Sequence, residues 1–393
     1  MTLSQDAKAA AMRVLLHNIH GPFGELPRAA AWGYPEPYTR DLTISALGML
    51  VTGEEELRKA VRSTLVALAC AQTERGHIPS LAHDPKDCGA SDTTPLFLIA
   101  VALYREAAGE PDFLCEATRK AMFWMEFQSP DDAVMVTQQP TSDWRDEMWV
   151  WGYGLYVNSL LFESLRLHGQ KERATALGAL MNRRGPRETI GVERIHEGMR
   201  SPNLPHYSLC VYKMYRSERF DLLGNSLAVL FGIANRKQAN DMIDWIEERC
   251  AELRDAGALQ GGLPPCLFPF VEPGDADWMP RYEEFNRVGT YHNGGVWPFV
   301  CGFYVAALVA AGRTELARVR FAELTDMVRR SRNEQLSFGF NEWHTPQDGR
   351  PHGEDWQTWS AAMYLYAASC IETGQTPFFH RDDEPTIPVR DAR

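Results

Sequence analysis

Paired helical patterns recur along this chain of 393 residues and constrain its fold more than any other feature. Apolar residues at helical spacing form consecutive segments, which are joined by short turns and separated by long loops rich in glycine, proline and aromatic residues. The expected pairs are 41–50 with 54–73, 94–108 with 112–127, 153–168 with 171–181, 224–234 with 237–253 and 296–311 with 314–330, followed by a last helix over 356–373. The leading helices begin about every 50–70 residues, a spacing typical of a repeated helical hairpin.

The two helices of a pair differ in composition, and this difference predicts their layers. Leading helices such as 96–104 are almost entirely apolar, so we expect them inside. The following helices carry charges at regular intervals, as in 54–59 and 241–249, so we expect them outside. An N-terminal helix near 5–17 would pair with the last helix and close a ring. The sequence therefore predicts an all-α fold, an (α/α)6 barrel of six hairpins that forms a single catalytic domain over residues 1–375.

Two segments fall outside this helical pattern. Residues 133–137 (AVMVT) have the composition of one short strand. The C-terminal tail, 376–393, contains three prolines and mixed charge, so we expect it to be poorly packed.

The composition excludes several classes of partner. The formal net charge of -12, with no local cluster of Lys and Arg, disfavours nucleic acid and anionic membranes and favours a small neutral or cationic substrate. The eight cysteines lack a CxxC pair, so we expect reduced, mostly buried thiols, no metal site and no cofactor. No signal-peptide stretch or membrane-length apolar run occurs, so we expect a cytoplasmic protein. A homo-oligomer is left open.

The long loops all precede leading helices, so they open on one end of the ring, where we expect the active site. The first loop, 32–41 (WGYPEPYTRD), combines Trp32 and Tyr38 with Arg40 and Asp41. Aromatic faces cover the C–H surfaces of sugars, and charged groups bond the hydroxyls. As an alternative, Asp41 caps the following helix.

The second loop offers weaker candidates. Asp92 stands directly before a predicted helix, so it either caps that helix or points into the cavity. His77 and His83 lie in the same loop without a third ligand, so we do not expect a metal there.

The third loop, 140–153 (PTSDWRDEMWVWGY), is the densest in charged and aromatic residues. Apolar aromatic surroundings raise the pKa of a carboxyl group, as general acid catalysis requires. Asp143 and Asp146 are therefore candidate acids, with Trp144 as a sugar contact and Asn158 on the helix that follows. A solvated acidic turn is the alternative, although it does not account for the aromatic residues.

Two later loops complete the expected site. The segment 289–298 (GTYHNGGVWP) and the segment 338–360 (FGFNEWHTPQDGRPHGEDWQTWS) both combine aromatic with polar side chains. Their candidate residues are Tyr291, His292, Asn293, Trp297, Glu342, Trp343 and Trp356. Glu342 is far from Asp146 in sequence, yet two carboxyls from opposite sides of a ring can flank one glycosidic bond. Motifs of metalloproteases, α/β-hydrolases, P-loop proteins and dinucleotide-binding proteins are absent from the sequence.

At these loops the chain resembles the neutral/alkaline invertase family and, more distantly, the trehalases, processing α-glucosidases and glycogen-debranching glucosidases, which share the six-hairpin barrel. TYHNGGVWP at 290–298 is similar to the family's YHNGGSWP. NEW at 341–343, with Asp348 and Gly349, resembles WPEYYDG, whose glutamate is the catalytic base of the family. Three further segments are similar to family segments: YTRD at 38–41, FDLLGNSLA at 220–228 and WQTWS at 356–360.

Around the predicted acid, the chain departs from the invertase pattern. The invertases carry IDRRMG, whereas residues 143–147 read DWRDE, closer to the WMDA-type segment of debranching glucosidases. In both patterns the aspartate precedes a helix with Asn or Gln, here Asn158, which favours Asp146 over Asp143.

The resemblance implies an inverting glycoside hydrolase, of α-glucosidase or β-fructofuranosidase type, that acts on a small α-glucoside such as sucrose. Asp146 would be the general acid, protonated near neutral pH, and Glu342 the ionised general base. Alternatives are a hydrolase of another α-glucosyl oligosaccharide or conjugate, and an inactive carbohydrate-binding scaffold. A sugar epimerase on the same barrel is a further alternative, and it predicts that His77, His292 and His344 converge on one sugar.

Overall fold

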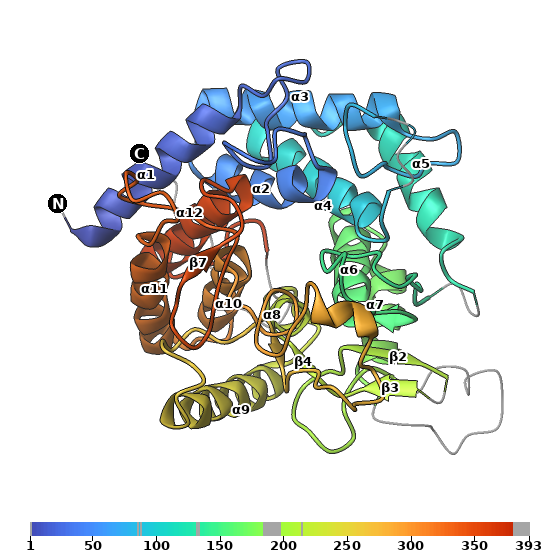
Figure 1. Cartoon of the computed structure of the whole chain (residues 1–393). Coiled ribbons are helices and arrows are strands. Elements are labelled where there is room, and N and C mark those ends of the chain that lie inside the picture. The colour runs from blue at the N-terminus through green and yellow to red at the C-terminus, as the bar shows by residue number, and fades with distance from the viewer. Residues whose placement is uncertain are drawn as a thin grey trace, which may run out of the picture.

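The computed structural model of the chain describes residues 2–84, 86, 89–130, 134–183, 198–213 and 215–379. Six helices form its inner ring: α2 (Thr39–Val51), α4 (Thr93–Ala108), α6 (Leu155–Leu167), α8 (Leu222–Leu230), α10 (Pro298–Ala310) and α12 (Thr358–Thr373). Each inner helix contacts the next, and α12 contacts α2, so the ring is closed (Figure 1). The outer helices are α1 (Leu3–Asn18), α3 (Glu55–Ala71), α5 (Cys115–Glu126), α7 (Lys171–Met181), α9 (Arg236–Asp255) and α11 (Thr314–Val328). The predicted (α/α)6 barrel is confirmed, and α1 packs on α12 as expected.

The two layers differ in burial as their compositions predict. Every residue of α10 is buried, because this inner helix has neighbours on all sides. By contrast, α3 buries one stripe, Leu57, Val61, Thr64, Leu65 and Leu68, at helical spacing. Small residues let inner helices approach closely: a Cβ on Gly48 of α2 would overlap the backbone carbonyl of Ala362 on α12.

Within the described residues, seven short strands lie in the loops, more than the sequence predicts. A three-stranded antiparallel sheet joins β1 (Tyr153–Gly154), β2 (Cys210–Tyr212) and β3 (Tyr215–Ser217), with Tyr153 opposite Val211 and Val211 opposite Arg216. Two more antiparallel pairs join β4 (Phe220–Asp221) to β5 (Leu267–Phe268), and β6 (Trp343–His344) to β7 (Pro351–His352). A 3-10 helix covers Pro280–Glu283.

The strand expected over 133–137 is wrong for its described residues, 134–137, and Ala133 lies outside the described range. This segment is instead bound to α6 by a side chain. The carboxamide of Asn158 accepts from the backbone N–H of Val136 at 2.9 Å and donates to its carbonyl at 2.9 Å, which replaces the backbone partners of a strand.

The C-terminal tail begins with packed residues. Phe379 is buried against Phe231 and Tyr366, and the hydroxyl of Tyr366 donates to the carbonyl of Pro377. The rest of the expected tail, 380–393, lies outside the described residues.

Five of the cysteines are buried, Cys210, Cys250, Cys266, Cys301 and Cys370, and the exposed ones are Cys70 and Cys115, while Cys88 lies outside the described range. Among the described helices, none is long and apolar enough to cross a membrane.

Candidate active site

A pocket of about 120 Å³ lies among the loops that lead into the inner helices. Its lining residues are Tyr34, Tyr38, Arg40, Asp41, Trp144, Asp146, Tyr291, His292, Trp297, Glu342, Gln357 and Trp359. Nine of these were predicted as site residues from the sequence. The structure therefore brings together both predicted catalytic carboxyls and seven predicted sugar contacts.

The two predicted catalytic residues reach this pocket from opposite sides of the ring. Asp146 lies in the loop before α6, and Glu342 lies in the loop before α12. In the order of ring contacts, α6 and α12 are three helices apart in either direction. A ligand in the pocket would therefore lie between the two carboxyl groups, as the two-carboxylate mechanism of glycoside hydrolysis requires.

Glu342 is a buried residue of the pocket lining. Its residue surface is only 7% exposed. Burial, followed by the nearby charges of Asp41 and Asp146, raises the pKa of Glu342 to about 8, although a backbone hydrogen bond from Glu354 acts in the opposite direction. Burial likewise raises the pKa of Asp41 to about 7, against the effect of Arg40. Near neutral pH Glu342 is therefore mostly protonated and Asp41 about half protonated. This differs from the ionised Glu342 expected from the sequence, because the structure buries Glu342 more deeply than Asp146.

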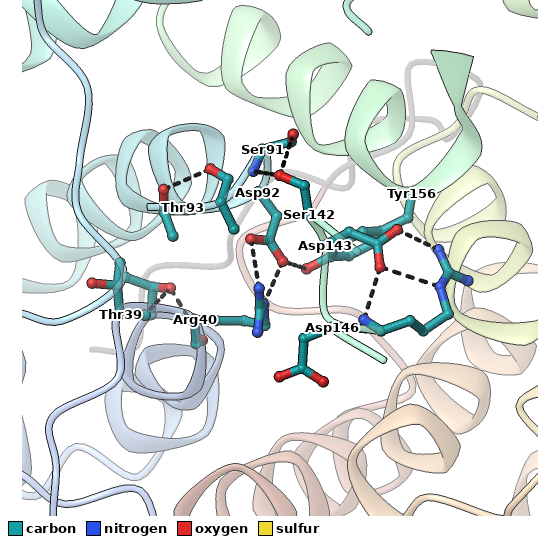
Figure 2. A network of polar contacts seen from close by, with 12 residues as sticks. Thr39, Arg40, Ser91, Asp92, Thr93, Ser142, Asp143, Asp146 and Tyr156 are labelled. Carbon is teal, nitrogen blue, oxygen red and sulfur yellow. Dashed lines mark hydrogen bonds and ion pairs between the residues drawn. The ribbon is translucent and has the colours of Figure 1, made fainter. Parts of the chain in front are cut away.

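Asp146 has a more open environment. Its side chain is 60% exposed, and desolvation by the surrounding protein still raises its pKa, while the Arg40 guanidinium acts to lower it. Figure 2 shows its carboxylate turned away from Asp143. The Nε2 atom of His292 lies 4.0 Å from Oδ1 of Asp146, and burial keeps the pKa of His292 well below its ordinary value. Asp146 is thus an accessible carboxyl beside a neutral imidazole.

Aromatic rings form the walls between the two carboxyls. Trp297 stacks on His292, with ring centroids 5.2 Å apart and planes inclined by 17°. Trp144 meets both rings edge-on at centroid distances of 5.2 Å. Such faces suit the C–H surfaces of a sugar ring.

Arg40 lines the pocket, and Asp92 lies behind it. Arg40 Nε donates to Asp92 Oδ2 at 2.5 Å and Nη2 donates to Oδ1 at 3.2 Å (Figure 2). Asp92 occupies the N-cap position of α4, yet its side chain makes no capping hydrogen bond. Neither sequence alternative for Asp92 therefore describes it, because it bonds to Arg40 rather than to the helix or to the pocket.

Asp143 does not reach the pocket. It is 1% exposed and accepts hydrogen bonds from the backbone and side chain of Arg145, and the other side of Arg145 lies 3.0 Å from Asp221 Oδ2. Although burial opposes it, the Arg145 guanidinium holds the pKa of Asp143 below its ordinary value. Asp143 is a buried, ionised partner of Arg145, whereas Asp146 faces the pocket.

Five other predicted sugar contacts also lie outside the lining. Trp32 and Trp356 pack on each other at the surface with centroids 5.3 Å apart, and Trp343 stacks on His352 at 4.3 Å. Asn158 and Asn293 are fully buried. Asn293 bonds the backbone of residues 271 and 286, and Asn158 bonds residues 136 and 154, so both asparagines hold loops together.

The structure adds residues that the sequence analysis missed. Tyr34, Gln357 and Trp359 line the pocket, and all three lie in segments singled out from the sequence. Trp356, which the sequence predicts as a sugar contact, stands just before α12 with a φ of 57°, and its ring packs on Trp32 instead. Gly353 contacts Glu342 closely: a Cβ at this position would overlap the glutamate side chain.

The histidines named for the epimerase alternative do not converge. His292 lines this pocket, whereas His77 and His344 line two other cavities. In the described part of the chain, no group of three or more His, Cys, Asp or Glu could hold a metal ion.

Comparison with known proteins matches the part of the chain that contains Glu342. Residues 213–374 match the family model for alkaline and neutral invertase. The resemblance to these invertases is confirmed over this part of the chain. Over 158 residues the chain is 32% identical to cytosolic invertase 1 of Oryza sativa subsp. japonica, an alignment that covers 39% of this chain and 26% of the rice protein. The probable alkaline/neutral invertase D of Arabidopsis thaliana is also 32% identical over 158 residues, covering 39% of this chain and 27% of that protein. These alignments span about a quarter of each relative's length. The family-model match, residues 213–374, includes Glu342 and excludes Asp146.

Solved structures show the same fold over nearly the whole chain. An uncharacterized conserved protein from Thermus thermophilus has a TM-score of 0.66 at 16% identity, covering 91% of this chain and 99% of that chain. A GH63 mannosylglycerate hydrolase from the same organism has a TM-score of 0.63 at 17% identity, with the same coverage. A bacterial glucoamylase has a TM-score of 0.61 at 14% identity, covering 94% of this chain and 56% of that chain.

Proposed function

We propose that this chain is an inverting glycoside hydrolase that acts on a small neutral α-glucoside, with sucrose as the leading substrate. The observation that carries this proposal is the pair Asp146 and Glu342, which enters one aromatic-walled pocket from opposite sides of the ring. The match of residues 213–374 to the invertase family supports sucrose in particular. The location of the rice relative suggests the cytoplasm as the site of action.

In the proposed mechanism, Asp146 protonates the leaving oxygen, and Glu342 removes a proton from a water molecule on the opposite face of the sugar. That water attacks the anomeric carbon as the bond to the leaving group breaks, so the configuration inverts. We expect the two carboxyls to lie about 6.5–9.5 Å apart, which leaves room for the water.

The reactive form carries a proton on Asp146 and none on Glu342. Desolvation favours the first condition, because it raises the pKa of Asp146. The second condition depends on pH, because the pKa of Glu342 is about 8. The proposed enzyme should therefore work best between the pKa values of the two carboxyl groups, with a bell-shaped pH profile.

A hydrolase of another α-glucosyl oligosaccharide or conjugate is the second candidate. Two observations favour it over a strict invertase: the family match excludes Asp146, and one structural neighbour is a mannosylglycerate hydrolase. A glycerate leaving group fits this pocket poorly, however, because Arg40 is already paired with Asp92 beside three carboxyls.

A substrate panel tests the proposal. Sucrose, trehalose, maltose, isomaltose and glucosylglycerate are incubated with the wild-type protein and with Glu342→Gln, and released glucose is measured. We expect wild-type turnover of sucrose, or of one other neutral member, that Glu342→Gln lacks. Tight sugar binding with no turnover of any member would contradict the proposal and favour a carbohydrate-binding scaffold.

A further inference from the structure

The pocket lining contains more acidic than basic side chains. Asp41, Asp146 and Glu342 contribute three carboxyl groups, and Arg40 contributes the one guanidinium among the described lining residues. Asp92 is fully buried behind Arg40 and binds two of its nitrogens, Nε and Nη2. Because of this contact Asp92 holds the pKa of Arg40 above its ordinary value, although burial alone would lower it. The positive charge that faces the pocket is therefore neutralised from behind.

Three inner helices contribute to this arrangement. Arg40 comes from the first turn of α2, Asp92 precedes α4, and Tyr156 of α6 donates its hydroxyl to Asp92 Oδ2 at 3.4 Å (Figure 2). Burying a carboxylate is costly unless it is paired, and apolar residues can stabilise such a position equally well. Helix capping does not account for Asp92 either, because its side chain makes no capping bond. The ion pair with Arg40 is therefore the remaining explanation for a buried aspartate at position 92.

The pairing also limits what Arg40 can donate. A guanidinium binds a ligand carboxylate best through two parallel N–H groups. With Nε and Nη2 engaged by Asp92, Nη1 is the nitrogen of Arg40 for which the described residues provide no partner. The side chain is 14% exposed, and its remaining N–H groups lie on Nη1 and Nη2. These groups can bind sugar hydroxyls, but a ligand carboxylate would meet a cation whose charge Asp92 already compensates.

We infer that Asp92 is a specificity-determining residue: by neutralising Arg40, it excludes glycosides whose leaving group carries a carboxylate and reserves the pocket for neutral ones. The inference rests on the proposed function of this pocket as a sugar site. Loss of the Asp92 charge would free a guanidinium fork and remove one of the negative charges near an incoming anion.

Calorimetric titration tests the inference without requiring turnover. Gluconate and gluconamide have nearly the same shape and differ by one charge, and glucose serves as the neutral sugar probe. For Asp92→Asn we expect gluconate affinity to rise at least about tenfold, with glucose and gluconamide affinity nearly unchanged. High salt should weaken this gain. Asp92→Ser removes the same charge with a residue favoured at helix starts, so it repeats the test in a second background.

Two control variants separate the pocket charge from general effects. Asp143→Asn removes an equally buried carboxylate from Arg145, which does not line the pocket, and Tyr156→Phe removes the hydroxyl while Asp92 keeps its charge. Neither should gain gluconate affinity. An unchanged gluconate affinity in both folded Asp92 variants, or an equal gain in Asp143→Asn, would overturn the inference. Absence of glucose binding to the wild-type protein would instead overturn the proposed function, and the inference with it.

Discussion

Asp146 and Glu342 face one pocket, but the protein holds their two loops by different kinds of contact. The Asp146 loop depends on side chains from distant segments. Arg145 pairs with both Asp143 and Asp221. The hydroxyl of Tyr282 accepts from the backbone N–H of residue 149 at 2.8 Å, and the side chain of Asn286 donates to the carbonyl of residue 147 at 2.6 Å. This loop is therefore fixed by long-range partners.

The Glu342 loop is fixed mainly by its own neighbours. The strands β6 and β7 pair directly after Glu342, and the backbone of His344 exchanges two hydrogen bonds with Val296 at 2.8 and 2.9 Å. Asp355 accepts hydrogen bonds from Asn341, at 2.5 Å, and from the backbone N–H groups of residues 332 and 333. Most of these partners lie within about 25 residues of Glu342, so one continuous motif carries the geometry. The comparison teaches that a local motif holds one half of the site, whereas contacts between distant segments hold the other half.

The largest expected effect comes from removing either carboxyl. Asp146→Asn and Glu342→Gln should each lower kcat/KM by about 10²–10⁴-fold, because each variant removes proton transfer in the transition state. Steady-state kinetics on the substrate identified by the panel measures this loss.

Asp143→Asn is the matched control for Asp146, since it changes the neighbouring aspartate of the same loop. Its buried pair with Arg145 makes it a structural residue, so we expect it to lose roughly 3–5 kcal/mol of unfolding free energy and to keep most of its activity where it is folded. If Asp143→Asn loses activity as Asp146→Asn should while Asp146→Asn stays active, the two roles are reversed.

A smaller loss of activity is expected from a substitution at Gly353, whose backbone lies against Glu342. Gly353 has a φ of 69°, and a side chain there would overlap Glu342. Gly353→Ala should displace the base and lower kcat by about 10–100-fold. Gly374→Ala is the control, because Gly374 has a φ of 67° with open space around it. Equal activity of the two variants would contradict this role for Gly353.

The pH dependence of kcat/KM should report the effect of the neighbouring carboxyl groups on Glu342. A base must be deprotonated and an acid protonated, so kcat/KM should have a bell-shaped pH profile with one limb near the pKa of Glu342, about 8. Asp41→Asn should move this limb to lower pH, since the charge of Asp41 raises the pKa of Glu342. A wild-type profile without any limb near pH 8 would contradict the buried setting of the base.

The raised pKa of Glu342 should also make the stability of the folded protein depend on pH. The pKa of Glu342 is raised from 4.5 to about 8 in the folded state, so folding is favoured below pH 4.5 and loses this contribution as the pH rises to 8. Glu342→Gln should consequently be more stable than the wild-type protein above pH 8, by on the order of 2–4 kcal/mol, and lose that advantage below pH 4.5. Denaturant unfolding at pH 4 and pH 9 checks this difference.

The sequence predicts the barrel and its layers because helical periodicity and charge repeat in every hairpin. It also predicts Glu342, Tyr291, His292 and Trp297 as site residues, since they lie in continuous motifs. It favours Asp146 over Asp143 only through the resemblance, because the role of Asp143 depends on Arg145 and on Asp221, which is far away in the chain. It could not show that Asp92 bonds Arg40 or that Trp356 turns outward, because the first is a contact between helices and the second a backbone angle.

The anomeric configuration of the first product tests the central claim most directly. Proton NMR of the sugar released from an α-glucoside, recorded before mutarotation, distinguishes the two anomers. The opposed positions of Asp146 and Glu342 predict β-glucose, by single displacement with inversion. Initial release of α-glucose would contradict the account, because retention requires a covalent intermediate and a closer pair of carboxyls.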